Sequence, residues 1–279
     1  MTEVGFVGLS LIIITTIFSY KGFTNAAFYD RYRFEVDKIL IEKDYKRIIT
    51  SGFLHSGWMH LLFNMFCLYS FGGFLEHYLG AIPFLLIYLA GLVGGELLSL
   101  YIHRNHGAYS SIGASGAVCG VIFASIALFP GMKIGFFILP LAIPAWIYGL
   151  LFVAYTIYGI RSQRGNTGHD AHLGGALIGM TAALLMHPSA FTENLLVILL
   201  IALPALTFIY FIATRPHVLL TGNYRVPKKK YYTIDDTYNA SKLNREKELD
   251  AILDKINKKG MAGLTKKEKE LLEQYSQMR

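Results

Sequence analysis

The feature that most constrains this chain is a series of long apolar stretches that hold almost no charge. Charged residues make up 16% of its 279 residues, whereas a soluble globular domain carries about 25%. Most of the charged residues lie in one long segment near the N-terminus and in the part beyond residue 214. This uneven distribution predicts a membrane-embedded body followed by a polar tail.

Seven stretches are long enough to cross a bilayer, because a membrane-spanning helix needs roughly 20 apolar residues. They are residues 4–20, 58–77, 82–103, 112–129, 134–160, 170–187 and 195–213. The fifth is longer than a span needs and contains Pro140 and Pro144. Prolines are tolerated in such helices because neighbouring helices satisfy the carbonyls that they leave free. We therefore predict an all-α membrane protein with a six-helix core and a seventh transmembrane helix.

The remaining segments are too polar to span a membrane. Residues 21–57 mix aromatic and aliphatic residues with charges of both signs, as is typical of amphipathic pieces at a membrane interface. We expect a core over residues 1–190 with this long interfacial loop, an additional transmembrane helix over 191–214, and a soluble basic tail over 215–279. A helical hairpin is expected at residues 239–279, where Thr265 and Glu268 form a capping box.

The composition argues against several classes of partner. The formal net charge of +7 comes mainly from the tail and the long loop, without any motif of known nucleic-acid docking type. Attraction to anionic lipid headgroups explains this charge more simply. The two cysteines, Cys67 and Cys119, lie inside apolar stretches and are expected to be packing residues, since their spacing fits neither a disulfide framework nor a zinc site. No cleavable signal peptide is expected at the start of the chain.

Polar residues that lie within membrane spans are costly and are therefore functional candidates. His60 and Asn64 are four residues apart at the start of the second helix, so they share a helical face. Ser115 opens the fourth helix, and His172 lies at the start of the sixth. Because even-numbered helices run in the same direction, these groups are expected in one layer near one membrane face. His55 precedes the second helix and is expected to brace the long loop.

Glycines at the starts of two of these helices predict close packing between them. Gly175 and Gly179 form a G-x-x-x-G face, which permits tight contact with a neighbouring helix. If that neighbour is the fourth helix, with Gly116 and Gly120 facing it, His172 comes close to Ser115. A serine within hydrogen-bond reach of a histidine is an activated nucleophile. His60, Asn64 and a backbone amide near Ser115 could then stabilise an oxyanion.

Taken together, these motifs resemble those of the rhomboid intramembrane serine proteases. The matching residues are His55, His60, Leu61, Asn64 and Met65 in the second helix, Gly72 and Glu76 at its end, Gly113-Ala114-Ser115-Gly116 in the fourth helix, and Ala171, His172, Gly175 and Gly179 in the sixth. The resemblance covers about half of the chain, from Asp44 to Pro188, with the motifs in the family's order.

The resemblance implies a six-helix rhomboid core and a Ser–His dyad, with Ser115 attacking and His172 acting as general base. It implies that His60, Asn64 and the Ser115 amide stabilise the oxyanion, and that Gly113, Gly116, Gly175 and Gly179 are helix-packing residues at the site. The expected activity is hydrolysis of peptide bonds in or near transmembrane helices of single-span substrates. Neither a cofactor nor a metal is expected, the lipid bilayer is the surrounding partner, and the oligomeric state is left open.

The chain also departs from the family pattern. Lys46-Arg47 stands where many members have Trp-Arg, and Cys119 stands where many have an aromatic residue that packs on the catalytic histidine. Asp170 precedes His172 by two residues, so on a helix it points away and is not expected to complete a triad. His169 and His172 have a spacing that suits metal ligation, but the His-Glu-x-x-His motif of a metalloprotease is missing.

Two other functions are alternatives to proteolysis. Inactive relatives of this fold bind membrane clients, but they lack the serine or the histidine, and this chain has both Ser115 and His172. A transporter would show repeated broken helices or a polar pathway through the midplane, whereas the polar groups here lie near one end of their helices. Intramembrane proteolysis is therefore the favoured prediction.

The membrane and its sidedness follow less directly from the sequence. We expect an integral, multi-pass protein of a bacterial plasma (inner) membrane. The long loop 21–57 contains seven Lys and Arg residues, and the opposite face offers little more than Lys133. The positive-inside rule therefore places the site's mouth in the cytoplasm, whereas the resemblance implies a mouth outside it. Of these two conflicting placements, we favour the one that the resemblance implies.

Overall fold

The computed structural model of this chain describes residues 5–135, 142–162 and 168–214, together with Ile252, Lys255, Ile256, Leu264 and Thr265. The chain divides into two compact units, Met1–Pro227 and Lys228–Arg279. In the second unit Ile252, Lys255 and Ile256 are helical. Apart from these few residues, the predicted tail hairpin over residues 239–279 lies outside the described part of the chain.

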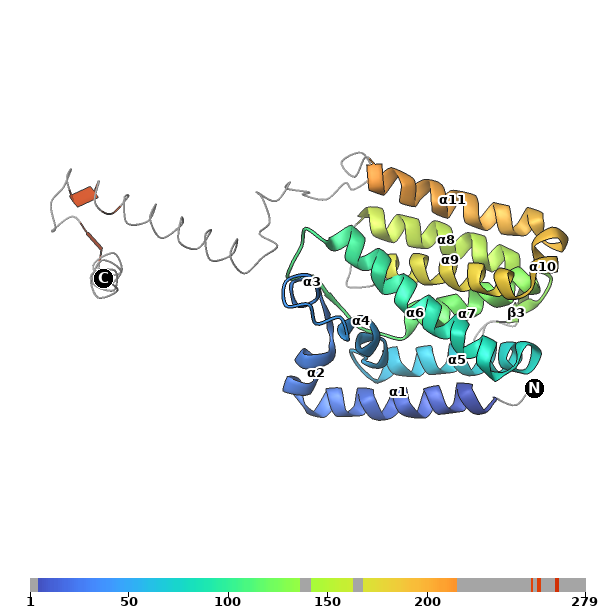
Figure 1. Cartoon of the computed structure of the whole chain (residues 1–279), viewed down its shortest axis with the longest axis horizontal. Helices are drawn as coiled ribbons and strands as arrows, with labels where there is room; N and C mark the ends of the chain where they lie inside the picture. Colours follow the sequence, from blue (N-terminus) through green and yellow to red (C-terminus); the bar gives the residue numbers. More distant parts are fainter. Residues whose placement is uncertain are drawn as a thin grey trace. The chain divides into compact units, whose positions relative to one another are not determined.

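The first unit is a bundle of long helices that lie side by side (Figure 1). Their bounds are α1 Phe6–Thr24, α5 Trp58–Leu79, α6 Ala81–His103, α7 Ser115–Leu128, α8 Ala145–Ser162, α9 His169–Met186 and α11 Leu195–Thr214, and a short α10, Pro188–Glu193, precedes the last. Within the described residues, four helices (α1, α5, α6 and α11) are long and apolar enough to cross a membrane. The predicted fold class, an all-α membrane protein, is confirmed.

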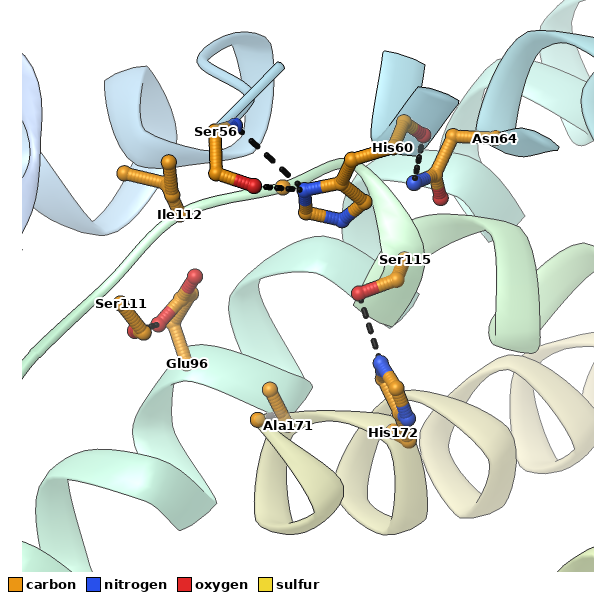
Figure 2. A pocket seen from close by; sticks show the side chains of 11 residues that line it. Ser56, His60, Asn64, Glu96, Ser111, Ile112, Ser115, Ala171 and His172 are labelled. Carbon is orange, nitrogen blue, oxygen red and sulfur yellow. Dashed lines mark hydrogen bonds between the residues drawn. The ribbon is translucent and has the colours of Figure 1, made fainter. Parts of the chain in front are cut away.

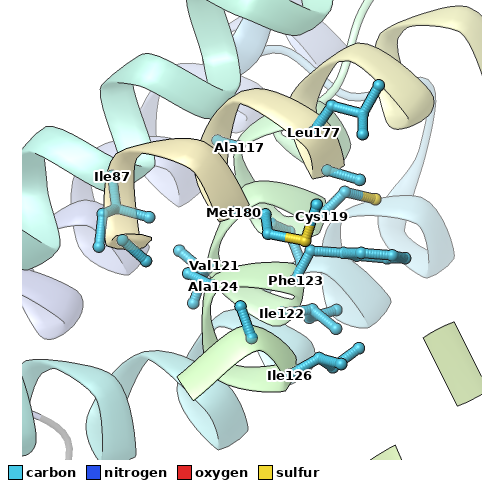
Figure 3. Packing of buried hydrophobic residues seen from close by; sticks show 14 of the residues in the cluster. Ile87, Ala117, Cys119, Val121, Ile122, Phe123, Ala124, Ile126, Leu177 and Met180 are labelled. Atoms are coloured by element: carbon cyan, nitrogen blue, oxygen red, sulfur yellow. The ribbon is translucent and has the colours of Figure 1, made fainter. Parts of the chain in front are cut away.

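The central helix of the bundle is α7, which is only 14 residues long. Every residue of α7 after Ser115 is buried. Figure 3 shows its apolar side chains packed beside Leu177 and Met180 of α9. A helix enclosed by other helices does not need to match the thickness of the bilayer, which accounts for the shortness of α7. The outer helices carry the large exposed apolar residues, such as Ile82 and Leu196, as expected of a surface that lies in lipid.

Small residues hold α7 against α9. A Cβ atom added to Gly175 would overlap the carbonyl oxygen of Gly116, and a Cβ on Gly179 would overlap the backbone of Gly120. On the other side, a Cβ on Gly91 of α6 would lie 3.1 Å from the Gly120 Cα atom. Close backbone approach of this kind is what small-residue faces permit in membranes. The start of α9 is thereby held beside the start of α7.

The predicted helix over residues 134–160 is wrong in its first part. Two short strands, β3 (Lys133–Gly135) and β4 (Ala142–Pro144), pair antiparallel there, and α8 begins only at Ala145. Proline disfavours helical backbone in the residue before it, so Pro144 keeps Ile143 extended. Proline is tolerated at the beginning of a helix, which is why α8 starts directly after Pro144.

The segment between α1 and α5 folds into a compact layer rather than an open loop. It contains α2 (Ala26–Tyr32), β1 (Phe34–Glu35), α3 (Val36–Leu40), α4 (Arg47–Thr50) and the 3₁₀ turn η1 (Ser51–Phe53). Strand β1 pairs with β2 (Ser110–Ser111), which leads toward α7. Buried Arg47 donates hydrogen bonds to the carbonyls of Asp30 and Arg33 and to the Asp44 carboxylate. Burial by itself raises the pKa of the Asp44 carboxyl, but the hydrogen bonds and charges of Arg47 and Lys46 together lower it below its ordinary value.

Glu76, near the end of α5, fixes the N-terminus of α1. Its carboxylate accepts hydrogen bonds from the backbone N–H groups of Val7 (2.9 Å) and Gly8 (2.7 Å). The first N–H groups of a helix have no partner within the helix, and a negative charge there is favourable. Glu76 therefore has a structural role, because it holds the N-terminus of α1 against α5.

Candidate active site

Ser115 and His172 meet where α7 and α9 begin. The Nε2 atom of His172 lies 2.7 Å from the Oγ atom of Ser115, as Figure 2 shows. This distance is that of a good hydrogen bond. Ser115 is the first residue of α7, and His172 lies in the first turn of α9. The glycine contacts between the two helices thus bring a hydroxyl and an imidazole into direct contact.

Gly113 makes room for a third polar group beside this pair. Its φ angle is +131°, a backbone conformation that residues with a side chain rarely adopt. A Cβ atom at this position would lie 2.9 Å from Cε1 and 3.0 Å from Nε2 of His60. Glycine is therefore required both for the turn that precedes Ser115 and for the approach of the His60 ring.

His60 and Asn64 line the same cavity as Ser115 and His172 (Figure 2). The Nδ1 atom of His60 lies 3.1 Å from the Ser56 hydroxyl, which directs Nε2 toward Gly113. The Asn64 amide donates one hydrogen bond to the backbone carbonyl of His60 at 2.9 Å. A carboxamide has two N–H donors, so one remains for another acceptor.

The cavity has a volume of about 400 Å³ and contains more polar groups than the sequence analysis found. Its lining consists of Ser56, His60, Asn64, Glu96, Ser111, Ile112, Gly113, Ser115, Gly168, Ala171 and His172. Glu96 and Ser111 were missed. A carboxylate in the apolar stretch 82–103 was the available signal for Glu96, because such residues are rare in membrane spans.

His55 lies behind the cavity and supports the turn before Ser115. Its Nε2 atom accepts the backbone N–H of Ala114 at 3.4 Å, and its Nδ1 atom lies 2.8 Å from the hydroxyl of Ser19. Because the Ser19 hydroxyl donates to the Phe53 carbonyl, Nδ1 carries the proton. Burial, with a smaller effect of the neighbouring His60, lowers the pKa of His55 to about 3. His55 is therefore a neutral bracing residue of the loop.

His172 is held by packing with aromatic rings. The Phe152 ring of α8 lies 6.1 Å from the His172 ring, and Tyr148 stacks on Phe152 at 5.9 Å. Among the described residues, none forms a hydrogen bond with His172 Nδ1. Cys119 is buried one turn after Ser115, so the aromatic group comes from α8 instead of α7. Phe152 could not be predicted from the sequence, because α8 approaches α9 only in the folded bundle.

Asp170 points away from the dyad, as its spacing predicted. Its carboxylate accepts a hydrogen bond of 2.5 Å from the Ser99 hydroxyl and lies 3.1 Å from Nε2 of His103. Burial and the nearby Asp170 carboxylate raise the pKa of the Tyr109 phenol, which also contacts this network. Within the described ranges, no group of three or more His, Cys, Asp or Glu residues is arranged to hold a metal ion.

Comparison with known proteins identifies the family. The family described as Rhomboid domain matches residues 42–189, which is more than half of the chain. The chain belongs to the rhomboid family. Its members are generally intramembrane serine proteases, although some are inactive. A second match, to a family of unknown function (DUF6576), covers residues 232–278.

The relatives of this rhomboid include mitochondrial, chloroplastic and bacterial proteins. It is 37% identical to Rhomboid protein 1, mitochondrial, of Saccharomyces cerevisiae over 53% of this chain and 45% of the relative. It is 34% identical to Rhomboid-like protein 11, chloroplastic, of Arabidopsis thaliana over 52% of this chain and 54% of the relative. It is 28% identical to Rhomboid protease GluP of Bacillus subtilis over 74% of this chain and 39% of the relative. The match therefore spans about half of each relative or less.

Proposed function

We propose that this rhomboid is an intramembrane serine endopeptidase that uses Ser115 as nucleophile and His172 as general base. The observation that carries the proposal is the 2.7 Å contact between Ser115 Oγ and His172 Nε2 in the wall of a polar cavity. A hydroxyl in this contact can pass its proton to the imidazole as it attacks a carbonyl carbon. Both members of the dyad are present, which favours catalysis over a role in client binding alone.

The reaction proceeds in two halves. Ser115 Oγ adds to the scissile carbonyl while His172 Nε2 takes the hydroxyl proton, and the tetrahedral intermediate carries the negative charge on the former carbonyl oxygen. His172 then gives the proton to the leaving amine, and the C–N bond breaks to leave an ester on Ser115. In the second half His172 removes a proton from the water that attacks the ester, and returns it to Ser115 Oγ as the ester C–O bond breaks and the acid product leaves.

The negative charge would be stabilised by three donors around Ser115. His60 approaches through the space that Gly113 leaves, and Asn64 retains one free amide N–H. The Ser115 N–H belongs to the first turn of α7, where N–H groups have no partner within the helix and the helix dipole favours an anion. Donors fixed in this way stabilise charge without reorganising during the reaction.

The substrates are proposed to be single-span membrane proteins, cleaved in or near the transmembrane helix. Rhomboid proteases act on membrane-protein substrates within the bilayer. The apolar outer surface of this bundle and the position of the cavity at the starts of α5, α7 and α9 favour access by a helix end that has unwound. The plasma membrane of a bacterium stays a prediction, because the relatives include mitochondrial and chloroplastic proteins.

Purified protein in proteoliposomes with a panel of single-span substrates tests the proposal. The wild type should cleave at least one substrate and should react with a fluorophosphonate probe, whereas Ser115→Ala and His172→Ala should do neither. Ser125→Ala is the matched control, because Ser125 is a buried serine of the same helix whose hydroxyl bonds to the Val121 carbonyl. Equal cleavage by Ser115→Ala and the wild type would overturn the mechanism, and binding without cleavage by the wild type would favour a client-binding role.

A further inference from the structure

The active-site cavity contains one buried carboxyl group that the proposed mechanism does not use. Glu96 of α6 is 3% exposed and lines the cavity together with Ser111 (Figure 2). The Ser51 hydroxyl donates to its Oε1 atom at 3.2 Å, and the Ser111 hydroxyl lies 3.5 Å from its Oε2 atom. A carboxylate can accept about four hydrogen bonds, so Glu96 retains acceptor capacity toward the cavity.

Glu96 differs from the other buried carboxyl groups of the described helices. The Glu76 carboxylate accepts hydrogen bonds from the backbone of α1, and the Asp170 carboxylate contacts His103 and Ser99. Within the described part of the chain, by contrast, no Lys, Arg or His forms an ion pair with Glu96. Buried carboxyl groups in membrane helices normally have a cation or a full set of donors. The missing partner of Glu96 is therefore expected to enter through the cavity.

The arrangement around Ser115 indicates which part of a substrate would reach Glu96. Figure 2 shows His60 and Asn64 above the Ser115 hydroxyl, whereas Glu96 and Ser111 lie together to its left, in another part of the cavity. If the oxyanion points toward His60, the side chain on the attacked residue is directed away from it. Glu96 lies seven residues before the end of α6, or about two turns. A long side chain would be needed to reach this depth.

We propose that Glu96, with Ser51 and Ser111, forms a recognition site for a basic side chain on the substrate residue whose carbonyl Ser115 attacks. Arginine fits this site better than lysine, because its planar guanidinium binds a carboxylate through two parallel hydrogen bonds and leaves water more readily than an ammonium group. Glu96 would then determine specificity at the cleavage site without taking part in the proton transfers. The inference rests on the proposed function, since it concerns the same cavity.

Cleavage of matched substrates by the unmodified protein gives the first test. Four versions of one single-span substrate should carry arginine, lysine, citrulline or alanine before the cleaved bond. Arginine should exceed citrulline, which has the same shape without the charge, by about tenfold to 100-fold in kcat/KM, the range expected for a charge-assisted hydrogen bond. Cleavage of citrulline and arginine substrates at the same rate would overturn the proposal.

The second test assigns the preference to Glu96. Glu96→Gln should lower the ratio of arginine to alanine cleavage by at least tenfold, and Ser111→Ala should lower it less. Glu193→Gln, at an exposed glutamate of α10, is the matched control and should keep the wild-type ratio. A wild-type ratio in Glu96→Gln would contradict the assignment. Fluorophosphonate labelling of Ser115 in each variant reports whether the dyad is intact, so loss of the dyad is distinguished from loss of specificity.

Discussion

Gly175 of α9 lies so close to Gly116 of α7 that a single added Cβ atom would overlap the Gly116 carbonyl. This contact lies one turn from the dyad, so it controls the separation of Ser115 and His172. Replacing Gly175 by valine should force the two helices apart and reduce activity by about 100-fold or more, since a displacement of about 1 Å in an active site can have that effect. The variant should also unfold at a lower temperature than the wild type.

Thermal unfolding in detergent and fluorophosphonate labelling provide the measurements for Gly175→Val. Gly131→Val is the matched control, because a Cβ atom at Gly131 meets no atom within 4 Å. The control should label at the wild-type rate. Full labelling of Gly175→Val would show that α9 can shift without disturbing the dyad, and the role assigned to this glycine would then be wrong.

Phe152 should control the orientation of the His172 ring. Because Nδ1 of His172 has no hydrogen bond among the described residues, the ring at 6.1 Å is an important restraint on its position. Phe152→Ala should therefore lower kcat by about tenfold to 100-fold with little change in KM, since orientation acts on the chemical step. Phe152→Leu should retain more activity because it refills part of the space. An equal loss in both variants would indicate that bulk at this position is not what orients His172.

The contact between Ser115 and His172 could be predicted from the sequence because its determinants are local. Ser115 and His172 each open a helix, and glycines at regular spacing indicate which helix faces meet. Glu96 and Phe152 were not predicted, because their importance depends on where α6 and α8 lie in the folded bundle. The hairpin before α8 was mistaken for helix, since its residues are as apolar as those of a membrane span and only the prolines signalled the break. The order within residues 25–57 depends on Arg47, whose backbone partners could not be deduced from spacing.

The protonation state of His55 predicts a pH dependence of stability. Its pKa is lowered from the ordinary value of 6.5 to about 3 in the folded protein, mainly by burial. Between these values the unfolded chain binds a proton that the folded chain does not, so stability falls as the pH falls from about 6.5 toward 3. The loss from this group is at most about 1.4 kcal/mol per pH unit.

Unfolding temperatures of the wild type and of His55→Gln, compared at about pH 7.5 and about pH 5, measure this contribution. The variant should be less stable than the wild type at neutral pH, because the bonds to Ala114 and Ser19 are disturbed. The difference between the two proteins should shrink at the lower pH, where the wild type loses the contribution of its neutral histidine. The half-buried His60, whose ring lies 4.8 Å away, is retained in both proteins, so its own titration contributes to both. A difference that does not change with pH would contradict the assignment.

A comparison of Asn64 with Asn194 tests the oxyanion role proposed for Asn64 against a purely structural role of an amide. Asn64 lines the cavity, so Asn64→Ala should lower kcat by up to about 10²–10³, the effect of removing one oxyanion donor, with little change in unfolding temperature. The Asn194 amide donates to the carbonyls of Ala127 and Leu128 at the end of α7, which have no partner within that helix. Asn194→Ala should therefore lower the unfolding temperature and leave kcat close to the wild-type value. A loss of stability in proportion to the loss of activity in Asn64→Ala would contradict this role. The Asn64 amide would then only hold the start of α5 through the His60 carbonyl. The oxyanion would in that case depend on His60 and the Ser115 amide alone.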